Sequence, residues 1–170
     1  MEFQIYSQQE ALSQAGLTDY LLDTLVENLS YLFGEDMGTP ENREEWIAYN
    51  LKDEHPHWRV VVGGKDGSYL GFLIYTVEDR RLTVCDIEIN QSGRRNPILL
   101  LGLFQKAFQE ENRSFDTIAG YINKGNQVSQ DNFLKYATSV EERPRGYSFL
   151  IDEKAAEKLK SRVLKWRSPH

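Results

Sequence analysis

The hydrophobic pattern near the start of the chain changes from a strand period to a helix period. Residues 2–6 alternate between polar and apolar side chains, which predicts a short first strand. From Leu17 onwards, leucines and a valine recur every three or four residues, and this spacing predicts one buried face of a helix. Thr18 or Asp19 can cap this helix at its start, and Gly34 ends it.

The next segment combines a second helix with three β-rich runs. Thr39 is the expected N-cap of a helix that begins at Pro40 and continues to about Leu51. The Asp66-Gly67 dipeptide is a strong signal for a tight hairpin. We therefore expect an antiparallel meander of three strands, at residues 58–62, 69–77 and 82–89.

The pattern then predicts a strand–helix–strand crossover. Asn96 is the expected N-cap and Pro97 the first residue of a helix that ends near Glu110. Residues 115–122 form the strand that follows. A crossover of this length is expected to be right-handed, with its two strands parallel.

The remaining elements are a helix, a strand and a basic helix. Asn126 opens a helix to about Ala137, residues 146–151 form the last strand, and Asp152 caps a C-terminal helix that reaches about Trp166. The order β-α-α-β-β-β-α-β-α-β-α places the chain in the α+β (mixed α/β) class, with helices on the faces of a mixed sheet.

Composition narrows the class of protein. A chain of 170 residues, 40% of them hydrophobic, is expected to be a single domain over residues 1–170. The net charge of −6 argues against a general nucleic-acid binder. The single cysteine, Cys85, excludes an internal disulfide, and there is neither a signal peptide nor an apolar run long enough for a membrane span. We therefore expect a cytoplasmic protein.

A basic turn between strand 82–89 and the following helix carries the first functional signal. The turn is residues 91–97 and includes Arg94 and Arg95. Because a helix N-terminus offers free N–H groups and a favourable dipole, a turn of this kind can bind a phosphate. The alternative interpretation, a solvated basic turn, stays open.

Two further motifs resemble those of the GNAT acyltransferase superfamily. Residues 66–72, Asp-Gly-Ser-Tyr-Leu-Gly-Phe, resemble its acidic–Gly–x–x–hydrophobic–Gly–Phe hairpin, and Asn126 to Phe133 resembles its Asn-to-Tyr spacing. The resemblance covers about residues 3–151 and leaves the basic helix 152–166 outside. It implies a mostly antiparallel sheet with one parallel crossover, and transfer of an acyl group from acyl-coenzyme A to an amine.

The coenzyme loop departs from the family pattern. Its pattern, Gln/Arg-x-x-Gly-x-Gly/Ala, falls on residues 94–99, where Pro97 and Leu99 replace the two glycines. Pro97 has no N–H to donate, and Leu99 carries a side chain where the backbone normally approaches the phosphates. The resemblance nevertheless implies a set of coenzyme-binding residues: Ile89, Arg94, Arg95, Asn96, Ile98, Asn126 and Phe133.

The catalytic residues follow from the same resemblance. Asp86 and Glu88 share one face of their strand, and either carboxylate, Glu88 first, is the expected base for the amine. Phe133 replaces the family's tyrosine acid, so Tyr136, nearly one turn further, is the candidate acid. The structural alternatives are a solvent-facing carboxylate pair, with Cys85 buried as a small hydrophobe, and a core aromatic at Tyr136.

The acceptor region is suggested by charge and aromatic content. The first two helices and their connection carry several acids and aromatic residues, from which Glu35, Asp36 and Trp46 are the predicted acceptor-binding residues. His55 and His57 lack a well-placed third ligand, so no metal is expected.

The leading hypothesis is thus an acyl-CoA-dependent N-acyltransferase with acetyl-CoA or another acyl-CoA as co-substrate. Its acceptor is the amine of a small molecule or protein, and a homodimer stays open. One alternative is a GNAT-fold binding or regulatory protein that has lost the coenzyme site. Another is an α+β interaction domain that binds an anionic partner through its basic C-terminal helix.

Overall fold

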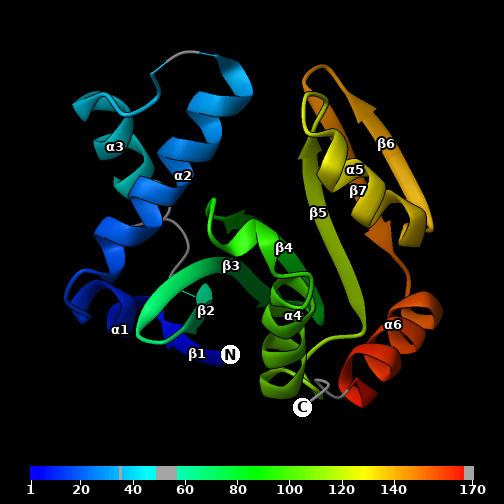
Figure 1. Ribbon diagram of the computed structural model, residues 1–170. Helices are drawn as coiled ribbons and strands as arrows, with labels where there is room; N and C mark the ends of the chain where they lie inside the picture. The colour runs from blue at the N-terminus through cyan, green and yellow to red at the C-terminus, as the bar shows by residue number, and fades with distance from the viewer. Residues whose placement is uncertain (35, 49–56, 167–170) are drawn as a thin grey trace.

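The computed structural model describes residues 1–34, 36–48 and 57–166 as one seven-stranded mixed sheet flanked by helices (Figure 1). The strand order is β1-β2-β3-β4-β5-β7-β6, and only the β4–β5 pair is parallel. The strands are β1 (Glu2–Ser7), β2 (Arg59–Lys65), β3 (Ser68–Glu78), β4 (Arg81–Ile89), β5 (Thr117–Asn123), β6 (Ser139–Arg143) and β7 (Gly146–Ile151).

The helices confirm the predicted order and add one short element. They are α1 (Gln8–Ser13), α2 (Leu17–Phe33), α3 (Pro40–Ile47), α4 (Leu99–Glu110), α5 (Gln127–Phe133) and α6 (Glu153–Lys165), with 3₁₀ turns η2 (Gly93–Arg95) and η3 (Leu134–Tyr136). The sequence-based order lacks α1 and the edge strand β6. None of the described helices is long and apolar enough to cross a membrane.

Three of the predicted caps are confirmed. The side chains of Thr39, Asn126 and Asp152 each accept a hydrogen bond from a backbone N–H in the first turn of α3, α5 and α6. The predicted end of α3 at Leu51 lies outside the described residues. Gly34 ends α2 in the left-handed conformation, as its lack of a side chain permits.

Two predicted helix starts are wrong. Gly16, not Thr18 or Asp19, precedes α2. The helix predicted from Pro97 begins at Leu99, because Asn96 folds the chain into a tighter turn first. The side-chain oxygen of Asn96 accepts from the Ile98 N–H at 3.2 Å, and its carbonyl accepts from the Leu99 N–H at 3.2 Å.

The sheet splits where β4 leaves β5. The two strands pair only from Arg81–Thr117 to Val84–Gly120, and beyond this point they diverge (Figure 1). A β-bulge at Cys85 accompanies the split, because Tyr75 pairs with Val84 and Ile74 with Asp86. A bulge bends its strand and leaves one residue out of the ladder.

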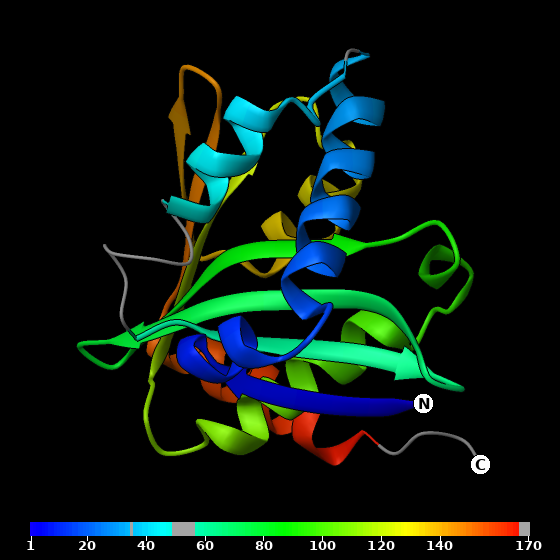
Figure 2. The same cartoon turned by 90° about the vertical axis from the view of Figure 1, so that its left-hand side faces the viewer.

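The two faces of the sheet carry different helices. The apolar face of α4 and α6 packs on one side of the strands, with Leu82, Leu103 and Ile118 in its core. α1 and α2 pack on the other side over β2 and β3, with Leu21, Val60 and other residues in a second core. In Figure 2, α2 crosses in front of β4 and α1 lies in front of β1 and β2, while α4 and α6 lie behind the strands. The diverging halves of β4 and β5 lie between these layers.

Candidate active site

The carboxylates of Asp86 and Glu88 lie at the split in the sheet. They alternate with Ile87 and Ile89, which pack towards α4, so the carboxylates point to the α2 side. Burial raises the pKa of Glu88, and the negative charge of Asp86 raises it further. Burial also raises the pKa of Asp86. Two carboxyl groups this close lose their protons one after the other, so the pair retains a proton above the usual carboxyl range.

Residues from α2 and η2 hold Glu88 in place. The amide nitrogen of Asn28 donates to the Glu88 carboxylate and, at 3.2 Å, to the Ile89 carbonyl. Arg94 in turn donates to the Asn28 side-chain oxygen at 2.5 Å and lies 5.6 Å from the centre of the Tyr31 ring. Sequence reasoning missed Asn28, because an isolated Asn on a helix has no motif that links it to a distant strand.

A small cavity of about 100 Å³ surrounds the carboxylates. We call it the carboxylate cavity. It is lined by Asp86 and Glu88 of β4, Tyr121 of β5, Asn126 before α5 and Phe133 at its end. The split between β4 and β5 thus gathers two predicted catalytic residues and two predicted coenzyme-binding residues in one place.

A second cavity of about 390 Å³ lies on the α4 side of the same split. This apolar cavity is bounded by α4, η3, α6 and the strands β4, β5 and β7. Val84, Phe133 and Phe149 line both it and the carboxylate cavity. The Phe133 ring stacks on Phe149 with centroids 6.1 Å apart, and it therefore forms part of the wall between the two spaces.

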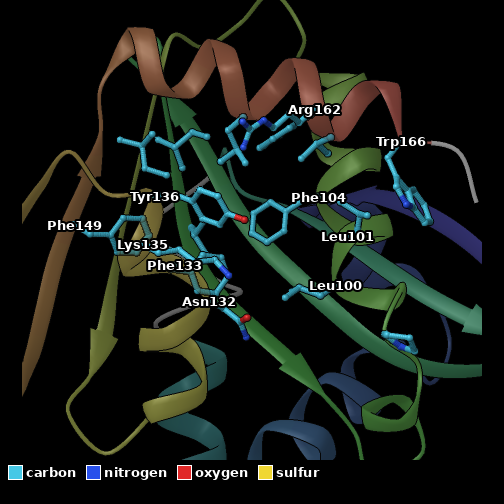
Figure 3. Close-up of a pocket in the computed structure, with 17 residues that line it drawn as sticks. Leu100, Leu101, Phe104, Asn132, Phe133, Lys135, Tyr136, Phe149, Arg162 and Trp166 are labelled. Atoms are coloured by element: carbon cyan, nitrogen blue, oxygen red, sulfur yellow. The ribbon is translucent and has the colours of Figure 1, made fainter.

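Tyr136 belongs to the apolar cavity and does not line the carboxylate cavity. In Figure 3 its hydroxyl points across the cavity towards the ring of Phe104. The structure therefore does not bring Tyr136 together with Asp86 and Glu88, and its role as an acid stays a prediction.

A third space, of about 750 Å³, lies on the opposite face of the sheet. We call it the sheet-face trough, because all its lining residues come from strands. Thr83, Tyr121 and Ser148 line it, and these residues alternate with those facing α4. Val84, Cys85, Tyr121 and Phe149 line both the trough and the carboxylate cavity. The carboxylate cavity therefore borders a larger space on each face of the sheet.

Cys85 itself is exposed, which corrects the expectation of a buried cysteine. The bulge at this position shifts the alternation of side chains along β4. Its thiol donates to the Thr83 carbonyl at 3.6 Å.

The start of α4 retains two free donors despite the missing glycines. Within the described part of the chain, the N–H groups of Leu100 and Leu101 have no acceptor, as expected for a first helical turn. The Leu99 side chain is fully buried against Gly63, Gly71 and Gly93. It therefore points into the core and not to the outside of the turn.

The other predicted coenzyme-binding residues are spread along this turn. Ile89 ends β4, Ile98 caps α4, and Arg95 is exposed on η2. Pro97 lines the apolar cavity beside the start of α4. Asn126 accepts from the Ser129 N–H at 3.0 Å, so its side-chain oxygen already caps α5.

The predicted acceptor residues do not line the carboxylate cavity. Asp36 is exposed and accepts from the Gly38 N–H at 2.8 Å. Trp46 lines a separate apolar cavity between α2 and α3. Glu35 and His55 lie outside the described residues. No cluster of three metal-ligating side chains occurs among the residues that the structure describes.

Comparison with solved structures identifies the fold. No protein-family model and no curated protein matches the sequence. The PaiA N-acetyltransferase of Thermoplasma acidophilum, solved with coenzyme A, superposes with a TM-score of 0.64 at 12% identity, over 89% of this chain and 99% of that one. Diaminobutyrate acetyltransferase EctA of Paenibacillus lautus was solved with diaminobutyric acid and coenzyme A. It superposes with a TM-score of 0.56 at 14% identity, over 89% of this chain and 95% of that one.

A third neighbour has a different kind of acceptor in its name. The ribosomal-protein-alanine N-acetyltransferase of Brucella melitensis gives a TM-score of 0.58 at 12% identity, over 88% of this chain and 97% of that one. These neighbours share the α+β fold of this chain. The chain therefore has the fold of the GNAT N-acetyltransferases.

Proposed function

We propose that this protein is an N-acyltransferase that moves an acyl group from a coenzyme A thioester to an amine. The observation that carries the proposal is the split between β4 and β5. Beyond Val84 and Gly120 a carboxylate pair lines a small cavity that borders a larger space on each face of the sheet. Two substrates can therefore meet there from opposite sides.

The carboxylate pair fits the role of base. An ammonium group cannot attack a thioester, so the amine must first lose a proton. The Asp86–Glu88 pair retains one proton because of burial and mutual repulsion, which leaves one basic site near neutral pH. Asn28 orients Glu88, and both carboxylates line the carboxylate cavity.

The backbone of β4 can stabilise the charge that develops on the carbonyl oxygen. Among the described residues, the edge of β4 that faces β5 has no strand partner after Val84. Fixed N–H donors at such an edge stabilise an oxyanion without reorganisation. In the balanced reaction the amine nitrogen forms a bond to the carbonyl carbon, the C–S bond breaks, and the amine's proton passes to the carboxylate pair as the thiolate leaves.

The start of α4 fits a pyrophosphate group. Leu100 and Leu101 offer free N–H groups at the positive end of a 12-residue helix. Leu99 leaves that surface clear because its side chain is buried. Arg95, exposed on the adjoining turn, can add a charge-assisted hydrogen bond. Arg94 is already bonded to Asn28, so its contribution to the coenzyme is smaller than that of Arg95.

The acceptor amine is proposed to approach from the sheet-face trough. The trough shares Cys85 and Tyr121 with the carboxylate cavity, and the carboxylates point to that face. The trough is open and bordered by the exposed strand β6. The predicted acceptor residues Glu35, Asp36 and Trp46 can be tested separately from the trough, because Asp36 does not line the trough.

Thermal unfolding with acetyl-CoA tests the coenzyme site directly. A ligand at about 100 times its Kd stabilises the native state by about 2.7 kcal/mol. For a chain of this size the midpoint should rise by roughly 5–10 °C. Free coenzyme A should act similarly, while ATP serves as a control for non-specific nucleotide binding.

A pair of arginine variants sharpens this test. Arg95→Gln should weaken acetyl-CoA binding by about tenfold or more, as expected for the loss of a charge-assisted hydrogen bond. Arg113→Gln removes the same charge from an exposed site after α4 and should leave binding unchanged. The absence of any shift with millimolar acetyl-CoA or coenzyme A would refute the proposed activity.

A further inference from the structure

The side chain of Asn28 joins the end of β4 to the turn η2. Its amide nitrogen donates to the Glu88 carboxylate and to the Ile89 carbonyl, and its amide oxygen accepts from Arg94. A reversed amide would place its oxygen against the carboxylate and its N–H groups against the guanidinium, and both contacts would be repulsive. The direction of the Asn28 amide is therefore set from both ends, by the charge of Glu88 and by that of Arg94.

The Arg94 end of this chain is exposed to solvent. A guanidinium has five N–H groups, and the contact with Asn28, at 2.5 Å, uses one of them. The backbone of η2 is held by Asn90, whose side-chain oxygen accepts from the Gly93 N–H at 2.8 Å and whose carbonyl accepts from the Arg94 N–H at 3.1 Å. An anion at this turn can therefore bond to Arg94 through further N–H groups, on a backbone that is already fixed.

The Glu88 end is partly buried, and its surroundings hold few charges. The other titratable side chains that line the carboxylate cavity are Cys85, Asp86 and Tyr121. The remaining polar side chains that line the cavity or bond to Glu88 are neutral: Asn28, Asn123, Asn126 and Ser129. No cation occurs among the described residues of this lining. The ionised form of Glu88 is therefore stabilised by the Asn28 donor and by the positive charge of Arg94 behind it.

We propose that Asn28 is a positioning residue that couples the binding of an anionic ligand at η2 to protonation of Glu88. The inference rests on the proposed function, in which this ligand is coenzyme A. An anion that bonds to Arg94 offsets its positive charge and weakens its hydrogen bond to Asn28, so the ionised form of Glu88 is less stabilised. Glu88 then binds a proton more tightly when the ligand is present. Because coupling is reciprocal, the ligand also binds more tightly when Glu88 is protonated.

The coupling makes coenzyme binding depend on pH. Affinity should fall as pH rises through the range in which Glu88 loses its proton. A difference of about one pKa unit between free and bound protein corresponds to about tenfold in affinity and to an uptake of up to about half a proton. A higher pKa also makes a carboxylate a stronger base, so bound coenzyme would improve Glu88 as acceptor of the amine's proton.

Calorimetry of coenzyme A binding tests the proposal without an acceptor amine. Titrations at pH 7 in two non-phosphate buffers of different ionisation enthalpy give the number of protons taken up. A phosphate group of the ligand titrates near pH 6 as well, so Glu88→Gln, which has no carboxyl proton at this position, supplies the baseline. The wild type should exceed this baseline by up to about half a proton. Equal uptake by the two proteins would overturn the inference and leave the acyltransferase proposal intact, and the absence of binding by the wild type would refute both.

A variant of Asn28 tests whether the coupling passes through this residue. Asn28→Ala interrupts the chain and should lower the proton uptake to the Glu88→Gln baseline. Glu27→Gln removes a carboxylate from the exposed neighbouring position of α2 and should keep the wild-type uptake. Wild-type uptake by Asn28→Ala would show that Arg94 acts on Glu88 without Asn28, and the proposal would be wrong.

Two arginine variants give a second readout that does not depend on the folding of Asn28→Ala. Both side chains are exposed on η2, so neither change removes a buried group. Arg94→Gln should abolish the excess proton uptake. Arg95→Gln should weaken coenzyme A binding and retain the excess uptake, because Arg95 has no contact with Asn28 among the described hydrogen bonds. Equal uptake by the two variants would contradict the role of Arg94.

Discussion

The Leu99 side chain occupies space that any side chain at position 93 would need, and position 93 is a glycine. A Cβ atom at Gly93 would lie 2.9 Å from the Leu99 Cδ2 atom and 2.2 Å from the Leu70 carbonyl oxygen. Gly63 and Gly71 leave room for the same leucine. The Leu99 side chain is thus accommodated by glycines on two strands and on the turn.

This packing predicts a strong effect of a single methyl group. Gly93→Ala should destabilise the protein by about 1–3 kcal/mol or more, because the added carbon meets a backbone carbonyl that cannot move freely. Gly125→Ala is the matched control, since its Cβ would lie 3.3 Å from the end of the Asn123 side chain. Urea unfolding of both variants measures the difference. Equal stabilities would show that the turn adapts at little cost.

The sequence predicted those parts of the fold that local signals determine. Thr39, Asn126 and Asp152 cap their helices through their own first turns, so the residue type and its position suffice. The short helix α1 has such a signal in the Ser7–Glu10 capping box, but its six residues are too few for a visible period. The strand β6 is exposed along its whole length and therefore has no alternation of apolar residues.

The site was less predictable, because its geometry depends on contacts between distant elements. The common face of Asp86 and Glu88 follows from the period of a strand. In contrast, Asn28 reaches Glu88 across 60 positions of sequence, and no pattern near either residue records this contact. The bulge that exposes Cys85 also results from the pairing of β3 with β4. The direction of the Leu99 side chain depends on glycines in three separate segments.

The raised pKa of Glu88 predicts how stability changes with pH. Because the folded state holds this proton more tightly than the unfolded state, it binds more protons between the ordinary carboxyl range and the raised value. The free energy of unfolding should therefore fall as pH rises through this window, by up to about 1.4 kcal/mol per pH unit for one proton. Below the window the contribution of protonated Glu88 is fully present.

Glu88→Gln should make the stability curve flatter, because the amide has no proton to lose. Urea unfolding at pH 5, 6, 7 and 8 compares the variant with the wild type, and the variant should gain relative stability towards pH 8. Part of the pH dependence of stability should remain in the variant, since burial raises the pKa of Asp86 as well. Glu44→Gln on the exposed face of α3 is the control. Identical slopes for Glu88→Gln and the wild type would contradict the raised pKa.

Tyr136→Phe distinguishes a catalytic hydroxyl from a wall of the apolar cavity. A general acid contributes about 10²–10⁴-fold to the rate of the chemical step. Because Tyr136 does not line the carboxylate cavity, we expect the variant to retain more than a tenth of the wild-type kcat. A thiolate is also a good leaving group near neutral pH, since the pKa of a thiol is about 8.5. A loss of 100-fold or more, with unchanged thermal stability, would instead establish Tyr136 as the acid.

Lys160→Met tests whether the C-terminal helix is held by the buried ammonium group. Methionine keeps much of the hydrocarbon stem but leaves the carbonyls of Asn112 and Phe115 without their donor, which should cost about 1–3 kcal/mol of stability. Lys158→Met, on the exposed side of the same helix, should change stability by less than about 0.5 kcal/mol. Because α6 walls the apolar cavity, Lys160→Met should also accelerate hydrogen exchange in α6 before the sheet opens. Exchange that rises equally in α6 and in β3 would mean that the helix and the sheet unfold as one unit, and that Lys160 contributes only to global stability.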